Sequence, residues 1–206
     1  MALSTFSDLK TSIALWLNRD DLTAVIPDFV TLAEADMNSR LRLRAMLTRA
    51  TATLDEAYET LPTDYLQMYR VVVNDERITF AATDLLAQHA LDWAGSAPKY
   101  YAITGSQLQL VPTPTATATA SIEMTYYARP TALSDSDTSN HILAASPGIY
   151  LYGALTQAAP YLGDDQRVQV WSTLYQDAIK LLQDADDAAE FPSPLVIHSS
   201  SWDMAP

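Results

Sequence analysis

Residues 6–42 read FSDLKTSIALWLNRDDLTAVIPDFVTLAEADMNSRLR, and this stretch predicts two amphipathic helices separated by a charged turn. Apolar residues recur at helical spacing over 6–17, and the polar run that follows ends the first helix. Pro27 is compatible with the second helix because it falls in the first turn. The far end of this helix carries three closely spaced bases: Arg40, Arg42 and Arg44.

The middle of the chain alternates apolar and polar residues, a pattern typical of β-strands. Strands are predicted at 48–54, 71–73, 78–80, 100–104, 108–111 and 121–128. A helix from Thr83 or Asp84 to about Gly95 interrupts them. We expect the last three strands to form a small antiparallel sheet, with an exposed Thr/Ala-rich loop over 113–120.

The last third returns to helical periodicity. After a polar linker at 134–140, helices are predicted at 147–162 and from Asp164 or Asp165 to about Ala189. The expected fold class is therefore α+β: mainly a helical bundle of about five helices, with a small antiparallel β-sheet or hairpin insertion and an extended C-terminal tail. Residues 1–190 would form one domain with the hairpin region at about 99–128, and residues 191–206 the tail.

The tail is apolar but short and interrupted by prolines. It is either disordered or docked on a partner, and its apolar side chains favour docking by strand addition or groove filling. We therefore predict that it contacts a partner protein through Phe191, Leu195, Val196, Ile197 and Trp202, together with the arginines at 40, 42 and 44.

Composition excludes several classes of protein. The formal net charge is −13, with 25 acidic residues against 12 basic ones, which disfavours a tight DNA binder. The chain has no cysteine, which excludes disulfides, thiolate zinc sites and a cysteine nucleophile. No run of about 18 apolar residues exists for a membrane span, and we expect no signal peptide. The acids crowd the last helices and the arginines concentrate at 40–49, so opposite-sign surfaces could meet in a repeated subunit contact.

The sequence contains little that indicates a catalytic site. His89, His141 and His198 are scattered, and none has metal-ligand spacing to another histidine. Asp135 and Asp137 alternate as in a calcium loop, but the loop's glycine and closing glutamate are missing. No phosphate loop, nucleophile elbow or nucleotide fingerprint is present. We predict no enzyme activity, no cofactor and no metal site.

The paired tyrosines offer a different kind of site. Tyr100-Tyr101 and Tyr126-Tyr127 place one ring on each side of a predicted strand, so one ring of each pair faces outward. An outward ring can anchor a protein interface, whereas the missing basic groove disfavours stacking on nucleic acid.

The order and spacing of several segments resemble the head-to-tail adaptor, or connector, proteins of tailed bacteriophages. The opening resemblance lies in the run Trp16 to Leu22, followed by Ile-Pro-x-Phe from residue 26 and Leu-Ala-Glu-Ala from residue 32. Further matching segments follow in the same order: 105–114, 124–130, 140–143, 150–155, 161–165 and 175–179. The resemblance covers roughly residues 4 to 185.

What this resemblance implies is a structural virion protein assembled in the host cytoplasm. Such a subunit belongs to a ring, expected to hold twelve copies, that sits between the portal protein and the tail nozzle or tail-tube proteins. The ring extends the DNA channel, and DNA passes through it without sequence-specific binding or any membrane contact. Alternatives are a tail-completion or minor tail protein and, from another class, a small acidic hydrolase or ligand-binding domain.

Overall fold

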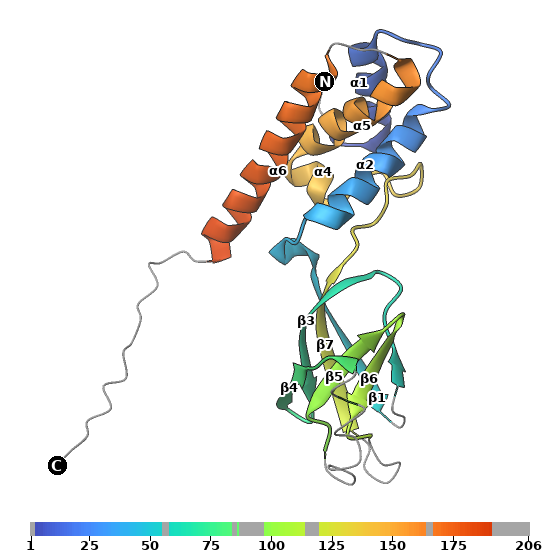
Figure 1. The fold of residues 1–206 in the computed structure, drawn as a ribbon. Helices are drawn as coiled ribbons and strands as arrows, with labels where there is room; N and C mark the ends of the chain where they lie inside the picture. The colour runs from blue at the N-terminus through green and yellow to red at the C-terminus, as the bar shows by residue number, and fades with distance from the viewer. Residues whose placement is uncertain are drawn as a thin grey trace, which may run out of the picture. The chain divides into compact units, whose positions relative to one another are not determined.

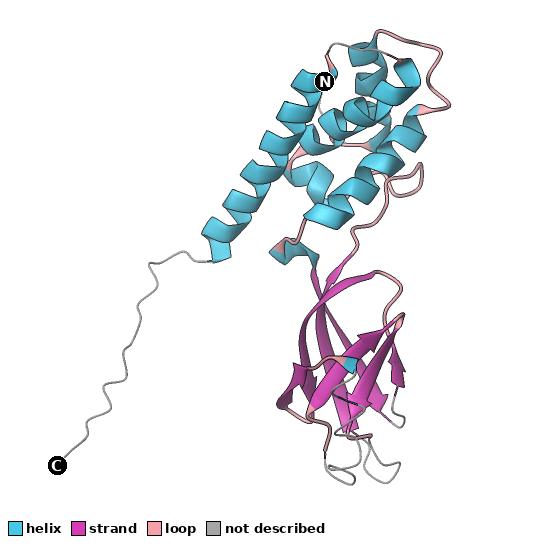
Figure 2. Ribbon diagram, viewed as in Figure 1, coloured by secondary structure: helices cyan, strands magenta, loops and turns pink. Residues whose placement is uncertain are grey.

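The computed structural model describes residues 3–54, 58–83, 86, 97–113, 120–163 and 167–190 (Figure 1). The described chain divides into two compact units. One, the helical unit, contains the residues up to Ala33 and those from Leu143 onward. The other, the sheet unit, contains Glu34–Ile142 and holds the β-strands (Figure 2).

The helical unit is built from α1 (Phe6–Leu17), the first half of α2 (Ile26–Arg40), α5 (Pro147–Leu162) and α6 (Val168–Glu190). The short helix α4 (His141–Ala145) begins at the end of the sheet unit. Helix α1 starts at a capping residue, because the Thr5 hydroxyl accepts a hydrogen bond from the Asp8 amide at 3.2 Å. It ends at Asn18, whose φ of 55° lies in the left-handed region.

Helix α5 lies at the centre of this unit, against α1 and α6. Its inward residues are almost completely buried: Ile149, Tyr150, Leu151, Gly153, Ala154, Leu155, Ala158 and Ala159. Arg167 fixes the start of α6, since its guanidinium donates to the Trp16 carbonyl oxygen at 3.1 Å and lies 4.8 Å from the Trp171 ring centroid. Leu17 completes the buried stripe of α1, whereas Trp16 is 44% exposed and stacks edge-on against Tyr152.

The sheet unit holds seven strands in the order β1-β7-β3-β4-β5-β6-β2. All neighbouring strands are antiparallel except β4 and β5, which are parallel. The bounds are β1 Leu47–Leu54, β2 Tyr58–Thr60, β3 Tyr65–Val73, β4 Glu76–Phe80, β5 Tyr100–Thr104, β6 Gln107–Val111 and β7 Ala120–Ala128. A single 3-10 turn, Arg44–Met46, precedes β1.

The seven-stranded sheet curls into a half-barrel around its own core (Figure 1). Alternate residues of the strands point into this core, as the period of two requires. Val71, Ile78, Leu108, Ile122 and Met124 are among the buried residues, and they come from four different strands. The core therefore depends on pairing between segments that are far apart in the sequence.

The expected fold class, a mainly helical bundle of about five helices with a small antiparallel hairpin insertion, is wrong because it underestimates the β-sheet. Predicted strands at 48–54, 71–73, 78–80, 100–104, 108–111 and 121–128 do form, but they join one mixed sheet with its own core. The main error concerns β7, which pairs with β1 and β3 instead of joining a small local sheet with β5 and β6. Local periodicity reports a strand's existence and its buried face, but not its partners.

Candidate interaction surfaces

The three arginines predicted to bind a partner lie on one segment of the sheet unit. Arg40 ends α2 and forms an ion pair with Asp36 one turn earlier, at 2.9 Å. Arg42 is half-buried, and its Nη1 donates to the carbonyl oxygens of Asn38 (2.8 Å) and Leu41 (2.6 Å). Its Nε donates to the side chain of Gln67 on β3 at 2.9 Å. Arg40 and Arg44 are exposed, whereas Arg42 ties the end of α2 to the sheet.

The other predicted contact residues lie outside the described part of the chain. These are Phe191, Leu195, Val196, Ile197 and Trp202. The helix predicted from residue 83 or 84 to 95, with His89, also lies largely outside it.

Groups with catalytic potential are isolated. Within the described ranges, no three His, Cys, Asp or Glu side chains come together in a way that could hold a metal ion. Asp137 belongs to a tight polar turn, where its amide donates to the Ser134 hydroxyl at 2.9 Å. The Nε2 atom of His141 is buried without a hydrogen-bond partner, and burial lowers the pKa of this imidazole. Every helix in the described residues is too short or too polar to serve as a membrane span.

A basic, partly aromatic surface covers the outer side of strands β1, β7, β3 and β4, and we call it the outer sheet face. Register places the side chains that alternate with the core residues on this side. The charged members are Arg49, Arg70, Arg77 and Glu123, and the others include Thr51, Tyr69, Val72, Thr125 and Tyr127. Three arginines thus face outward around a single glutamate on a chain that is acidic overall.

Ion pairs and rings order this face. Glu123 forms an ion pair with Arg49 at 2.9 Å and a longer one with Arg70 at 3.4 Å. Tyr69 packs edge-on against Tyr127, with ring centroids 6.1 Å apart, and remains 52% exposed. The prediction that one ring of each tyrosine pair faces outward is confirmed for Tyr126-Tyr127, because Tyr126 is buried in the core while Tyr127 faces outward. In the other pair Tyr101 is buried in the core, whereas Tyr100 is half-buried against a second apolar cluster.

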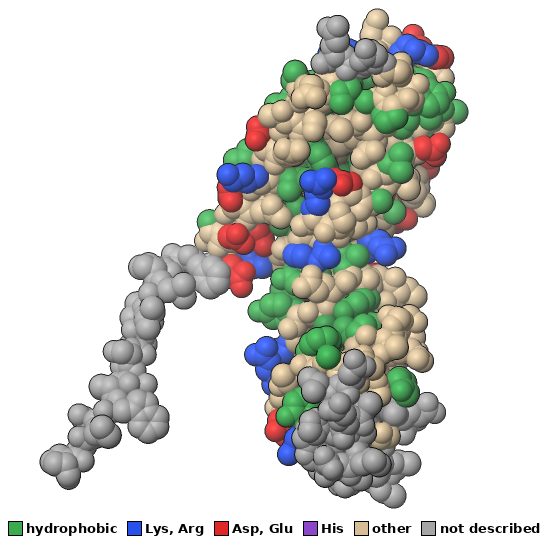
Figure 3. All heavy atoms as spheres, viewed as in Figure 1, with side chains coloured by type: hydrophobic (Ala, Val, Ile, Leu, Met, Phe, Trp, Pro, Cys, Tyr) green, Lys and Arg blue, Asp and Glu red, His purple; other side chains and the backbone are tan. Residues whose placement is uncertain are grey.

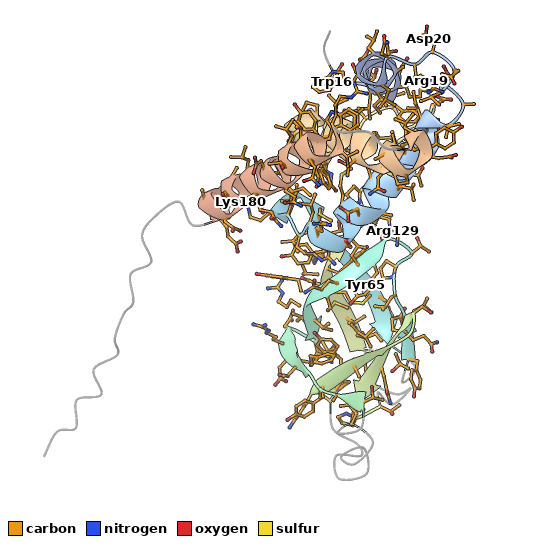
Figure 4. All side chains as sticks on the ribbon, turned by 45° about the horizontal axis from the view of Figure 1, so that its top comes forward. Trp16, Arg19, Asp20, Tyr65, Arg129 and Lys180 are labelled. Atoms are coloured by element: carbon orange, nitrogen blue, oxygen red, sulfur yellow. The ribbon has the colours of Figure 1, made fainter. Side chains whose placement is uncertain are left out.

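Helix α6 presents the second surface. Its inner stripe buries Trp171, Tyr175 and Ile179. The opposite side is exposed and combines apolar with acidic residues, and we call it the α6 strip: Val170, Asp177, Leu181, Asp184 and Asp187. Val170 is 58% exposed and Leu181 68%, so both aliphatic side chains are available for contact on this side of the helix. Acidic side chains gather towards the C-terminal end of α6, where Lys180 also projects (Figures 3 and 4).

The sequence predicts opposite-sign surfaces on the last helices and at 40–49, but it does not delimit either of the two surfaces described above. For the α6 strip the helical period is a usable signal, because it places Val170 and Leu181 opposite the buried stripe. The outer sheet face had no comparable signal, because Arg49, Arg70 and Arg77 become neighbours only through the pairing of β1, β7, β3 and β4.

Comparison with known proteins supports the resemblance seen in the sequence. No curated protein matches the chain. A family model, described as SU10 adaptor protein, matches residues 4–198, nearly the whole sequence and both structural units. The chain therefore belongs to the SU10 adaptor protein family, a family of phage head-tail adaptors.

Proposed function

We propose that this protein is the subunit of a ring of twelve copies that joins the portal protein to the tail and extends the DNA channel between them. Family membership makes the chain a structural adaptor and a component of the phage particle. The observation that carries the proposal is the family match over residues 4–198, which includes the helices, the sheet and part of the C-terminal tail. The role needs no cofactor, because the subunit acts by its shape and contacts.

Charge supports a channel that lets DNA pass. A net charge of −13 repels the phosphate backbone, so a wall made from such subunits does not hold the DNA. DNA then moves through the ring without sequence-specific binding. The outer sheet face is the exception to this acidity, and in the ring it is covered by protein.

Contacts with the portal protein involve the C-terminal tail and the arginine segment. We propose that residues 1–190 form the adaptor body and that residues 191–206 clasp the portal through Phe191, Leu195, Val196, Ile197 and Trp202. Arg40 and Arg44 are exposed on this body and contact the partner directly. Arg42 contributes by holding the segment between them against β3. The tail nozzle or tail-tube proteins bind the opposite end of the ring.

Native mass spectrometry of the full chain, alone and mixed with the portal protein encoded by the same phage, tests this function. We expect a cyclic oligomer, or a monomer that becomes many copies on the portal. A protein that stays monomeric and ignores the portal at all salt concentrations would refute the proposal.

The tail contact has a matched pair of variants. Leu195→Asp/Ile197→Asp places two charges on the apolar segment, whereas Ser199→Asp/Ser201→Asp adds the same charges to a polar one. We expect only the first variant to weaken portal binding, because it must desolvate carboxylates in an apolar contact. Equal portal binding by the two variants would exclude the clasp while leaving the adaptor role intact.

A further inference from the structure

We infer that neighbouring copies of this protein contact each other by seating the α6 strip of one copy on the outer sheet face of the next. The inference rests on the proposed ring and specifies the surfaces that build it. The outer sheet face belongs to the sheet unit and the α6 strip to the helical unit, so the contact joins unlike parts of two copies.

Charge selects this pairing over the others. The strip exposes Asp177, Asp184 and Asp187 with one base, Lys180, beside them. The sheet face carries three arginines around one glutamate, and Arg49 and Arg70 keep 65% and 46% of their side-chain surface exposed. Two strips facing each other would repel, as would two sheet faces, whereas strip on sheet is attractive.

Apolar groups on both surfaces supply binding affinity that exposed charges alone do not provide. Exposed ion pairs contribute little to affinity, because water screens them. Val170 and Leu181 are exposed on the strip, and Tyr69 is 52% exposed on the sheet face. Aromatic and aliphatic side chains of this kind form the anchors of protein interfaces, with charges around them.

The dimensions of the two surfaces also agree. The strip runs from Val170 to Asp187, which at 1.5 Å per residue is about 26 Å of helix. Strands β3 and β7 have nine residues each, or about 30 Å at 3.3 Å per residue. A helix about 10 Å wide lying along these strands covers two neighbouring strands and reaches the arginines on either side.

A contact between unlike surfaces has a geometric consequence. Each copy contributes its strip to one contact and its sheet face to another, so the contact is heterologous and repeats from copy to copy. Such a repeat closes into a ring when its rotation divides a full turn. The inferred contact therefore provides the head-to-tail interface that the proposed ring requires.

Two charge-reversed proteins test the pairing. The sheet variant is Arg70→Glu/Arg77→Glu, which leaves the 2.9 Å pair between Arg49 and Glu123 in place. The helix variant is Asp177→Lys/Asp184→Lys. Each variant alone confronts like charges, and we expect it to need at least about tenfold more protein than wild type to assemble, alone or on the portal. Mixed in equal amounts, the two variants restore assembly, because every strip then meets a sheet face of opposite charge.

The mixture also identifies which copies touch. Rescue requires the two variants to alternate around the ring, so native mass spectrometry should show equal numbers of each in every closed ring. Arg19→Glu/Lys99→Glu makes the same charge change at exposed positions that belong to neither the outer sheet face nor the α6 strip, and it is the control for the sheet variant. Circular dichroism confirms that each variant is folded before mixing.

Crosslinking gives a second measurement that does not depend on charge reversal. Because the chain has no cysteine, single cysteines can be placed without background. A short bismaleimide should join Leu181→Cys protein to Val72→Cys protein in a covalent dimer, and should not join Leu181→Cys to Lys99→Cys. Charge-reversed variants that assemble as wild type does, or a mixture that fails to recover together with no Leu181–Val72 crosslink, would overturn the inferred contact. Wild-type protein that forms no oligomer even with the portal would instead refute the proposed function and this contact with it.

Discussion

Gly153 lies where three helices of the helical unit meet, and its replacement tests how tightly they pack. A Cβ atom built on Gly153 of α5 would lie 3.0 Å from Cε2 of Tyr175 on α6 and 3.1 Å from Cβ of Ala33 on α2. Carbon atoms are attracted best at about 3.5–4.0 Å, so both contacts are too close. The Cβ atom of Ala33 is fixed to the helix backbone and the Tyr175 ring is buried, so neither group can move away without displacing its neighbours.

Two opposing effects set the magnitude for Gly153→Ala. Alanine stabilises a helix interior by about 1 kcal/mol over glycine, whereas overpacking a core costs about 1–3 kcal/mol. We therefore expect the helical unit to lose up to about 2 kcal/mol of unfolding free energy. Gly148 of the same helix is the matched control, because its Cβ would meet only the ring of Tyr152, at 3.3 Å. That ring is half-buried and can turn, so Gly148→Ala should be neutral or slightly stabilising.

Urea unfolding followed by far-UV circular dichroism, which is dominated by helices, compares the two variants. Gly153→Ala should unfold at lower urea than Gly148→Ala, with a difference of about 1–3 kcal/mol at an unchanged slope. Equal midpoints would show that α2, α5 and α6 have room to separate, and would refute the close packing.

Three further changes probe the sheet unit. Burial, followed by the hydrogen bond to Asp64, raises the pKa of Tyr126 from 10.0 to about 12. The contribution of this neutral hydroxyl to folding stability is therefore fully present below pH 10 and is lost as the pH rises towards 12. Tyr126→Phe should accordingly lose less unfolding free energy than wild type over this pH range, as measured by denaturant titrations. Asp75 has a φ of 66° in the turn between β3 and β4, so Asp75→Gly should raise the urea midpoint by an amount equivalent to about 0.5–1 kcal/mol, and a fall would contradict the strained turn. Arg42→Leu removes hydrogen bonds to the end of α2 and to Gln67, and should lower thermal stability by about 1–2 kcal/mol, while an unchanged melting temperature would mean that water replaces these bonds.

The helices could be predicted well because their signal is local. The periodic stripe placed a helix at 147–162, and α5 spans Pro147–Leu162. The helix predicted from Asp164 or Asp165 to about Ala189 likewise forms as α6, Val168–Glu190. In α1 the predicted apolar run over 6–17 ends at Leu17, which is buried, whereas the neighbouring Trp16 is exposed.

The sheet could be predicted only in pieces. The local pattern indicates six of the seven strands, but it misses β2 and all of β3 before residue 71. It also gives no partners: β1 and β7 pair although more than sixty residues separate Thr53 from Ser121 in the chain. Local patterns in a single sequence do not specify this strand pairing. Both the core of the sheet and the outer sheet face depend on the pairing. The arginines at 49, 70 and 77 therefore looked unrelated in the sequence, although they share one surface.

The distribution of charge argues that the acidity of this protein has a purpose beyond solubility. A surface designed only for solubility would mix both signs everywhere. Eight of the twelve bases lie within the residues of the sheet unit, but so do thirteen of the 25 acids, so both units are net negative. The signs separate only locally, with three arginines on the outer sheet face and three aspartates on the α6 strip. In the inferred contact, these two surfaces repel their own kind and attract each other. The inference therefore assigns to charge the direction in which copies add, and to Val170, Leu181 and Tyr69 the lifetime of each contact.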